Sequence, residues 1–247
     1  MIDDCCSKKI LKKLVKLFPV ALTKNEYYNR LTKTIIQQHC KKTDVCVDAG
    51  SHKGEILQMM LDAAPNGIHY AFEPIQELIN KYLKHFQFEV NVYAVALSNN
   101  RALEQFNLVK TNTAYSGLRR RFYDRKEKDT TITVQTDLLD NFIQPEQKID
   151  LIKLDIEGGE LWALQGAVKT IQSSQPLILF EFGKAAVAYD YDDKAMFQFI
   201  NETINYRIYT LRNWLNKSNA LTENEFHNYY EKGNEYFFVA APFKPII

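Results

Sequence analysis

Glycine, proline and cysteine are scarce in this chain of 247 residues, which contains 9 glycines, 7 prolines and 4 cysteines. The sequence shows no internal repeat and no low-complexity tract. The cysteines (Cys5, Cys6, Cys40 and Cys46) form no CxxC pair. A zinc ribbon or a disulfide scaffold is therefore not expected, and a cytoplasmic location is the simplest interpretation.

An excess of either sign of charge is missing too, because 31 Lys and Arg residues stand against 30 Asp and Glu residues. Proteins that bind nucleic acid usually carry a basic surface, so no nucleic-acid partner is expected. No apolar run reaches the roughly 18 residues that would span a bilayer. The chain begins with acidic residues and lysines interrupt the apolar residues that follow, so a secretory signal is not expected.

Residues 8–18, KKILKKLVKLF, have the spacing of an amphipathic helix with a lysine-rich face. Two interpretations remain open. The helix either caps the domain, or it lies on a partner or an anionic membrane surface, which would make the protein peripheral at the inner membrane surface. A second helix is predicted over residues 26–39, so residues 1–40 are interpreted as an N-terminal helical extension.

From residue 44 onward, short apolar runs alternate with helical patterns. The predicted strands cover residues 44–48, 67–73, 90–97, 149–155, 176–181, 206–211 and 236–241, and the predicted helices cover 55–63, 75–85, 160–172 and 192–204. This alternation predicts an α/β fold with a doubly wound, mainly parallel seven-stranded sheet. No convincing helix separates the last two strands, so the last strand is expected to run antiparallel. The domain is assigned to residues 41–247, with an insertion around residues 98–136.

The first predicted strand ends in the loop DAGSHKG, residues 48–54, and the second strand ends in Glu73. Ligands of open α/β sheets bind beyond the carboxyl ends of the strands. Gly50 and Gly54 would let the backbone approach a ligand closely and turn into the next helix. A carboxylate at position 73 can accept hydrogen bonds from both hydroxyls of a ribose. Together these features predict an adenosine-containing cofactor.

An NAD-dependent oxidoreductase would use the same kind of sheet and is the first alternative. Its dinucleotide-binding loop follows the pattern GxGxxG. Here His52 stands two positions after Gly50, and the third glycine is missing. This spacing favours a cofactor without a pyrophosphate.

Acidic side chains gather at the same predicted edge of the sheet. Asp155 ends the fourth strand, Glu157 and Glu160 follow it, and Glu181 ends the fifth strand. Their negative charge complements a sulfonium and an ammonium group, and a carboxylate can act as general base toward a hydroxyl. Favourable electrostatics at a helix N-terminus is an alternative role for Glu160. A divalent metal on Asp155, Glu157 and Glu181 is a further alternative, but we expect no metal.

The predicted insertion carries a basic stretch that includes Arg119, Arg120, Arg121 and Tyr123. One interpretation is a solvated charged loop. The other is a lid that binds the acceptor, with aromatic rings stacked on a sugar and arginines holding an acidic group. Under the second interpretation the acceptor is acidic.

Several of these motifs resemble the FkbM family of AdoMet-dependent methyltransferases, where AdoMet is S-adenosylmethionine. The similar segments, which lie within residues 44–183, are VCVDAGSHKGEI, YAFEP, AVALSN, SGLRRRFY, IDLIKLDIEGGELWALQGA and LILFEF. The resemblance implies a class I methyltransferase fold of the Rossmann-like type. It implies AdoMet in the loop formed by Asp48, Gly50, Ser51, His52, Lys53 and Gly54, with the ribose on Glu73. It also implies an adenine pocket at Ala96, Leu97 and Ser98, and a reacting centre beside Asp155 and Glu157.

Members of this family typically O-methylate sugars, glycan residues or hydroxyls of natural products. The resemblance therefore implies an O-methyltransferase that acts on a glycan or another small hydroxylated acceptor. For the general base we predict Glu157, then Asp155, then His52. Glu181 and the arginine stretch are predicted to bind the acceptor. The sequence lacks the Pro-Cys pair of cytosine-C5 methyltransferases and the Pro-Pro-aromatic motif of amino-group DNA methyltransferases. A non-catalytic AdoMet-binding protein is the second alternative.

Overall fold

The structure, a computed structural model, describes residues 23–123 and 125–243. The predicted helix over residues 8–18 lies outside the described residues. Among the described helices, none is both long and apolar enough to cross a membrane.

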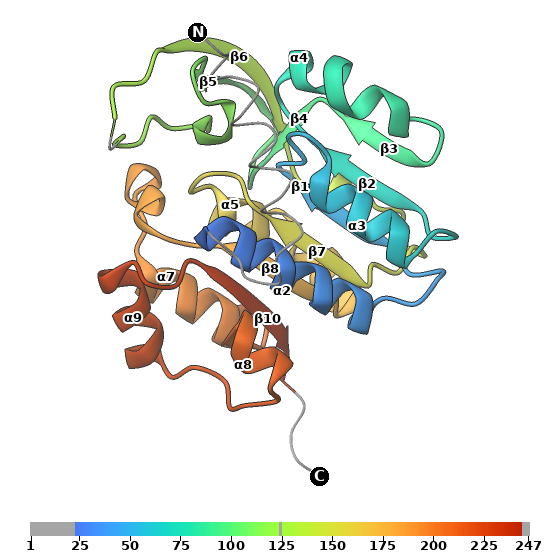
Figure 1. The fold of residues 1–247 in the computed structure, drawn as a ribbon, viewed down its shortest axis with the longest axis vertical. Helices are drawn as coiled ribbons and strands as arrows, with labels where there is room; N and C mark the ends of the chain where they lie inside the picture. The colour runs from blue at the N-terminus through green and yellow to red at the C-terminus, as the bar shows by residue number, and fades with distance from the viewer. Residues whose placement is uncertain (1–22, 124, 244–247) are drawn as a thin grey trace, which may run out of the picture.

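A seven-stranded sheet forms the centre of the molecule, with the strand order β3-β2-β1-β7-β8-β10-β9 (Figure 1). The strands are β1 (Cys46–Ala49), β2 (His69–Phe72), β3 (Val90–Tyr93), β7 (Leu151–Leu154), β8 (Leu177–Glu181), β9 (Tyr206–Thr210) and β10 (Phe237–Pro242). The first five in sequence run parallel, and β10 is antiparallel to both of its neighbours, β8 and β9. The predicted doubly wound sheet with an antiparallel last strand is confirmed.

The expectation that no helix separates the last two strands is wrong. Two helices, α8 (Leu211–Leu215) and α9 (Glu223–Lys232), separate β9 from β10. The chain returns after α9 and inserts β10 between β8 and β9, so the direction of β10 follows from its place in the sheet and not from a short connection.

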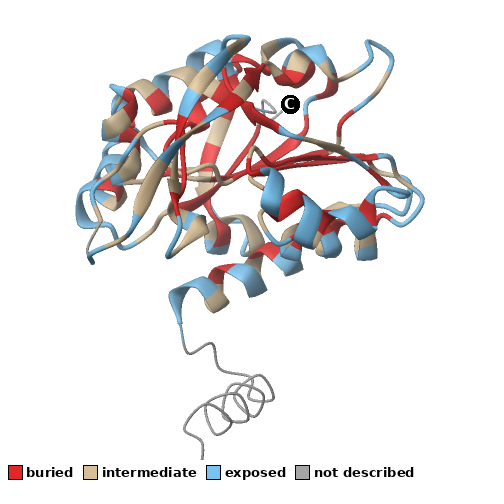
Figure 2. Cartoon of the chain, turned by 90° about the horizontal axis from the view of Figure 1, so that it is seen from above, coloured by how far each residue is buried: buried red, intermediate tan, exposed pale blue. Residues whose placement is uncertain are grey.

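Helices cover both faces of the central sheet, and the strands between them are buried (Figure 2). On one face lie α2 (Lys24–His39), α3 (Glu55–Ala63) and α8, whose apolar side chains pack with Leu151 and Val239. The helical turns after β2, namely α4 (Gln76–Leu78), η1 (Ile79–Leu83) and η2 (Lys84–Phe86), pack beside α3. On the other face lie α5 (Glu160–Gln165), α6 (Val168–Ser174), α7 (Asp193–Gln198), η6 (Phe199–Thr203) and α9.

The predicted helix over residues 160–172 is broken at Gly166, which separates α5 from α6. A Cβ at Gly166 would lie 2.0 Å from the carbonyl oxygen of Ser98, so the backbone at this break touches the backbone of the segment that contains Ser98. The predicted helices over residues 75–85 and 192–204 likewise change from α-helical to π-helical winding along their length.

A second sheet of three strands forms from the predicted insertion. Its order is β4-β6-β5, with β4 (Val95–Leu97), β5 (Ala102–Val109) and β6 (Asp129–Asp137). The strand predicted over residues 90–97 is in fact two strands, because the chain leaves the central sheet after β3 and pairs β4 with β6. The small sheet lies beside the ends of the central strands (Figure 1). It thereby places the β5–β6 connection next to the carboxyl edge, where ligands bind.

Candidate active site

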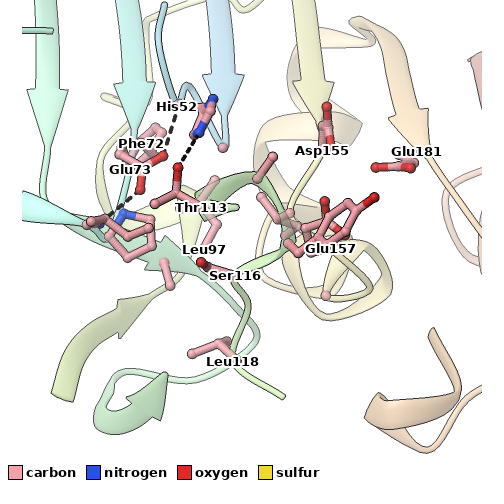
Figure 3. Close-up of a pocket in the computed structure, with 18 of the residues that line it drawn as sticks. His52, Phe72, Glu73, Leu97, Thr113, Ser116, Leu118, Asp155, Glu157 and Glu181 are labelled. Atoms are coloured by element: carbon pink, nitrogen blue, oxygen red, sulfur yellow. Dashed lines mark hydrogen bonds between the residues drawn. The ribbon is translucent and has the colours of Figure 1, made fainter. Parts of the chain in front are cut away.

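One cavity of about 480 Å³ lies beyond the carboxyl ends of β1, β2, β7 and β8 (Figure 3). The loop after β1 and the ends of β2, β7 and β8 form one wall. The β5–β6 connection, including the helical turn η3 (Thr113–Tyr115), forms the opposite wall. The strand order reverses between β1 and β7, so the cavity occupies the position at which doubly wound sheets bind their ligands.

The loop after β1 has the tight geometry that its glycines predict. Gly50 has φ +73°, and a Cβ at this position would lie 2.0 Å from the carbonyl oxygen of Asp155. Gly54 has φ +76°, and its Cβ would lie 2.7 Å from the Phe86 ring. The Ser51 hydroxyl donates to the Asp48 carbonyl oxygen at 2.7 Å. Only glycine fits at positions 50 and 54, because a side chain would face both a positive φ and a steric clash.

Glu73 lies at the end of β2 and is only 4% exposed. One carboxylate oxygen accepts the His52 amide at 3.0 Å, and the other accepts the Ile75 amide at 2.9 Å. Burial raises the pKa of Glu73 to about 7. Each oxygen has two lone pairs, so the group retains an acceptor site on each oxygen beside the cavity that it lines.

His52 connects the glycine loop to the opposite wall. Its Nε2 lies 2.8 Å from the Thr113 hydroxyl, a contact visible in Figure 3. Burial lowers the pKa of His52, so the ring is neutral at pH 7. The backbone of His52 has φ +48°, in the left-handed region that non-glycine residues rarely adopt.

Apolar side chains form the part of the cavity next to β4. Ala96 and Leu97 lie there between aromatic and aliphatic neighbours, which are Phe72, Val95, Phe106 and Leu118. Ser98 is fully buried behind this slot, and its amide donates to the Asp137 carbonyl oxygen. Of the residues predicted to bind the cofactor, six line the cavity: Gly50, His52, Glu73, Ala96, Leu97 and Asp155. Five do not line it: Asp48, Ser51, Lys53, Gly54 and Ser98.

Lys153 holds the glycine loop in place through its ammonium group, a role that was not predicted from the sequence. Its ammonium group donates to the carbonyl oxygens of Ala49 (3.2 Å) and Gly50 (2.9 Å) and lies 3.1 Å from Asp48 Oδ1. Burial by itself would lower the pKa of Lys153, but Asp48 and Asp155 outweigh it and raise the pKa. The signal in the sequence is a lysine inside an apolar strand, because a fully buried ammonium needs a partner.

Three of the predicted carboxylates meet at the far end of the cavity. Side-chain oxygens of Asp155, Glu157 and Glu181 lie within 4.8 Å of one another. Figure 3 shows the three residues grouped at one end of the pocket. Burial raises the pKa of Glu157 to about 8, with further contributions from Asp155 and Glu160. Burial and the charges of Asp155 and Glu157 raise the pKa of Glu181 well above its usual value. Carboxyl groups held in this way are suited to take up a proton near neutral pH.

Glu160 has a different role from these three residues. Its carboxylate accepts the amides of Ile156 (3.0 Å) and Gly158 (3.3 Å) and so closes the loop that carries Glu157. This geometry matches the alternative role at the helix N-terminus, since Glu160 is the first residue of α5.

Glu157 is held in an uncommon conformation by a residue of the opposite wall. Its φ is +61°, and its Oε2 lies 2.6 Å from the Arg121 guanidinium. The guanidinium also stacks over the Tyr115 ring, 4.3 Å from the ring centroid. A non-glycine residue at such a φ carries strain of about 1–3 kcal/mol, which accumulates preferentially at functional sites.

A family model described as the methyltransferase FkbM domain matches residues 48–209, more than half of the chain. The chain belongs to the FkbM methyltransferase family. The match includes the glycine loop, Glu73 and the three carboxylates. A search of curated proteins found no match to the chain.

The comparison with solved structures found similar chains at low sequence identity. A methyltransferase FkbM from Methylobacillus flagellatus KT is 19% identical, with 57% of this chain and 33% of that chain covered and a TM-score of 0.42. A putative rRNA-methylase from Clostridium thermocellum is 10% identical, with 85% and 90% covered and a TM-score of 0.46. A putative methyltransferase from Streptococcus mutans in complex with SAH is 9% identical, with 90% and 98% covered and a TM-score of 0.45. The strand order and the antiparallel β10 are those of a class I methyltransferase, of the Rossmann-like type.

The arginines of this FkbM methyltransferase have acidic partners within the chain. Arg119 pairs with Glu104 at 3.3 Å and Arg120 with Asp129 at 2.6 Å, while Arg121 pairs with Glu157. The Tyr123 hydroxyl accepts a hydrogen bond from the Asn107 side chain and donates to Asp129. Of these four residues only Arg121 lines the cavity, and the binding of an acidic acceptor by this stretch stays a prediction.

Residues that no sequence motif indicated complete the cavity. They include Asn25, Tyr28 and Asn29 of α2 and Tyr236 and Phe237 beside or within β10. The Tyr28 hydroxyl donates to Glu235 at 2.7 Å across 207 residues of sequence. Such a contact has no local signature, because it depends on where α2 and β10 pack in the folded chain.

Proposed function

We propose that this FkbM methyltransferase binds AdoMet and transfers its methyl group to a hydroxyl of a glycan or another small hydroxylated acceptor. The observation that carries the proposal is one cavity with two chemically different ends. Glu73 and the glycine loop lie at one end and the cluster of Asp155, Glu157 and Glu181 lies at the other.

The first end fits the adenosine part of AdoMet. The apolar slot at Ala96 and Leu97 suits an adenine ring, and the remaining acceptor sites of Glu73 suit two ribose hydroxyls. Gly50 leaves the backbone open to the ligand, since the space of its Cβ is already taken by the Asp155 carbonyl oxygen. When bound, AdoMet supplies a methyl group on a sulfonium, and the sulfur leaves as a neutral thioether.

The second end fits proton removal and orientation. The acceptor hydroxyl oxygen forms the new bond to the methyl carbon, and Glu157 takes the hydroxyl proton. A pKa near 8 makes this carboxylate a stronger base than an exposed one. Asp155 and Glu181 orient the hydroxyl beside Glu157.

The NAD alternative receives less support. A dinucleotide needs a second glycine where this chain has His52, whose amide is bonded to Glu73 and whose ring contacts Thr113. A pyrophosphate would have to displace both contacts. A non-catalytic role leaves unexplained why a strained, half-buried Glu157 lies beside the cavity and is paired with Arg121.

Calorimetry with AdoMet and with NAD separately tests the proposal. We expect AdoMet to bind and NAD not to bind. Glu73→Ala should weaken AdoMet binding by about 1.5–3 kcal/mol, the scale of hydrogen bonds to a charged group. Glu77→Ala is the matched control, since Glu77 is exposed on the neighbouring helical turn.

Unchanged AdoMet affinity in a folded Glu73→Ala variant would remove Glu73 from the cofactor site, and binding of NAD alone would overturn the proposal. The acceptor is then sought by incubating the enzyme and isotopically labelled AdoMet with glycan and lipid extracts.

A further inference from the structure

Two cysteine side chains are in contact on the face of the central sheet that α2, α3 and α8 cover. Cys40 is the residue that follows α2, and Cys46 is the first residue of β1. Their Sγ atoms lie 3.9 Å apart, and both cysteines are free. The sulfurs of a disulfide lie about 2.05 Å apart, so a covalent bond needs these two atoms to come roughly 2 Å closer.

Ordered backbone holds both cysteines in place. The Cys40 amide donates to the Ile36 carbonyl oxygen at 2.9 Å, and so continues the hydrogen bonding of α2 by one residue. The Cys46 amide donates to His69 Nδ1 at 3.3 Å, and β1 pairs with both β2 and β7. The contact between the two thiols is therefore a property of the folded chain and does not depend on a chance meeting of mobile segments.

The two sulfurs differ in their access to solvent. Cys40 is half-buried, and it precedes the exposed residues Lys41 and Lys42, whose positive charge attracts anionic molecules. Cys46 is fully buried. The hydrogen bond to Cys40, together with burial, raises the pKa of the Cys46 thiol. A reagent in solution therefore meets Cys40 first, and a reaction there removes the hydrogen bond that keeps Cys46 protonated.

We infer that Cys40 and Cys46 form a reversible disulfide, and that the oxidant is the disulfide of a small thiol. The Cys40 thiolate attacks one sulfur of the small disulfide, which gives a mixed disulfide and one small thiolate. Cys46 then loses its proton, attacks the Cys40 sulfur and releases the second small thiolate, and each released thiolate takes up a proton. Two protein thiols thus become one disulfide, and one small disulfide becomes two thiols.

The new bond ties the end of α2 to the start of β1. Nearer its beginning, α2 contributes Asn25, Tyr28 and Asn29 to the active-site cavity, and β1 leads directly into the glycine loop. Oxidation therefore fixes one wall of the cavity to the central sheet. It also closes a short loop of chain, which restricts the unfolded state and stabilises the folded one. This inference does not depend on which ligand the cavity binds.

The test uses the full-length chain with Cys5→Ser and Cys6→Ser, so that Cys40 and Cys46 are its only thiols. The protein is incubated with glutathione disulfide and its intact mass is measured. We expect the loss of two hydrogens, no bound glutathione, and full reversal by dithiothreitol. Trypsin cleaves at the lysines between the two cysteines, so the oxidised protein should yield two peptides joined by the disulfide.

Two matched variants in the same background separate the steps. Cys46→Ala removes the buried thiol and should retain one glutathione on Cys40. Cys40→Ala removes the accessible thiol and should remain unmodified. Urea denaturation should give a higher midpoint for the oxidised protein than for the reduced one, whereas glutathione disulfide should leave the midpoint of Cys40→Ala unchanged.

Four results would overturn the inference. Both thiols could remain free after incubation, glutathione could persist on the protein that has both thiols, or glutathione could modify Cys40→Ala. The fourth is an oxidised protein whose urea midpoint is equal to or below that of the reduced one. If circular dichroism shows that Cys46→Ala does not fold, the intact mass and the joined peptides of the protein with both thiols decide the question.

Discussion

At the scale of single residues, Glu157 combines a left-handed backbone, a buried carboxylate and an arginine partner. If its role is proton removal, Glu157→Gln should lower kcat by roughly 100-fold, the contribution of a positioned general base. Because burial already disfavours the charged form, the free energy of unfolding should change by no more than about 1 kcal/mol. Turnover with the acceptor found by labelled AdoMet, together with urea denaturation, measures both quantities.

The pH dependence of the wild type provides a second measurement of the same residue. The base must be deprotonated, so kcat should rise with pH up to the pKa of about 8 and then level off. Glu146→Gln, at an exposed loop position, is the matched control and should keep the wild-type profile. Full turnover in both Asp155→Asn and Glu157→Gln would show that these carboxylates are not at the reacting centre.

A metal ion on the three carboxylates is the remaining chemical alternative at this scale, because their oxygens lie within 4.8 Å of one another. Lys153 Nζ lies 3.8 Å from Asp155, and Arg121 lies beside Glu157. These two side chains already balance part of the negative charge of the carboxylates. We therefore expect EDTA to leave turnover unchanged. Loss of turnover in EDTA, with recovery on adding Mg²⁺, would establish a metal-dependent reaction instead.

At the scale of elements, the connection from β1 to α3 depends on Gly50 and on the close approach of β7. Gly50→Ala should lower the free energy of unfolding by the strain of a positive φ and by at least about 2 kcal/mol more, because the new Cβ would lie 2.0 Å from a backbone oxygen. Gly233 is the matched control: its φ is +59°, and no atom lies within 4 Å of an added Cβ. Gly233→Ala should therefore lower the free energy of unfolding by only about 1 kcal/mol.

Urea denaturation of both variants gives the two free energies of unfolding, and calorimetry gives their AdoMet affinities. Gly50→Ala should also lose AdoMet binding, whereas Gly233→Ala should bind normally. Equal stability losses in the two variants would mean that the contact between Gly50 and β7 is unimportant.

At the scale of the whole molecule, the buried carboxyl groups make stability depend on pH. Burial raises the pKa of Glu73 and Glu160 to about 7 and that of Glu157 to about 8. In the unfolded chain these groups titrate near 4.5, so at neutral pH the folded protein binds more protons than the unfolded one. Stability is thus highest below pH 4.5 for these groups and is lost as pH rises through 7 and 8.

Between pH 6.5 and 8.5 the free energy of unfolding should fall by about 3–4 kcal/mol, measured by urea denaturation without ligand. Burial lowers the pKa of His52 and His69, an opposite effect that acts only below the histidine pKa of 6.5. AdoMet should flatten the decline, because ribose hydroxyls would favour the charged form of Glu73. A stability that stays constant or increases over this range would contradict the burial of these acids.

Much of the cavity could be predicted from sequence because it is built from strand ends. The carboxyl ends of parallel strands share one edge, so a loop after one strand and acids after three others had to meet there. The sequence therefore predicts that Gly50, Glu73, Asp155 and Glu181 lie together, and the structure brings them to one cavity.

The sequence by itself thus determined the seven strands of the central sheet, the helices that follow β1, β2, β7 and β8, and the residues at the ligand-binding edge, since these follow from local periodicity and chain direction. Only the tertiary structure decided that the chain leaves the central sheet between β3 and β4 and that β10 enters between β8 and β9. It also decided that Arg121 meets Glu157 and that Tyr28 meets Glu235, 207 residues away. These contacts join segments far apart in sequence, and their energies depend on how whole elements pack, which no local pattern records.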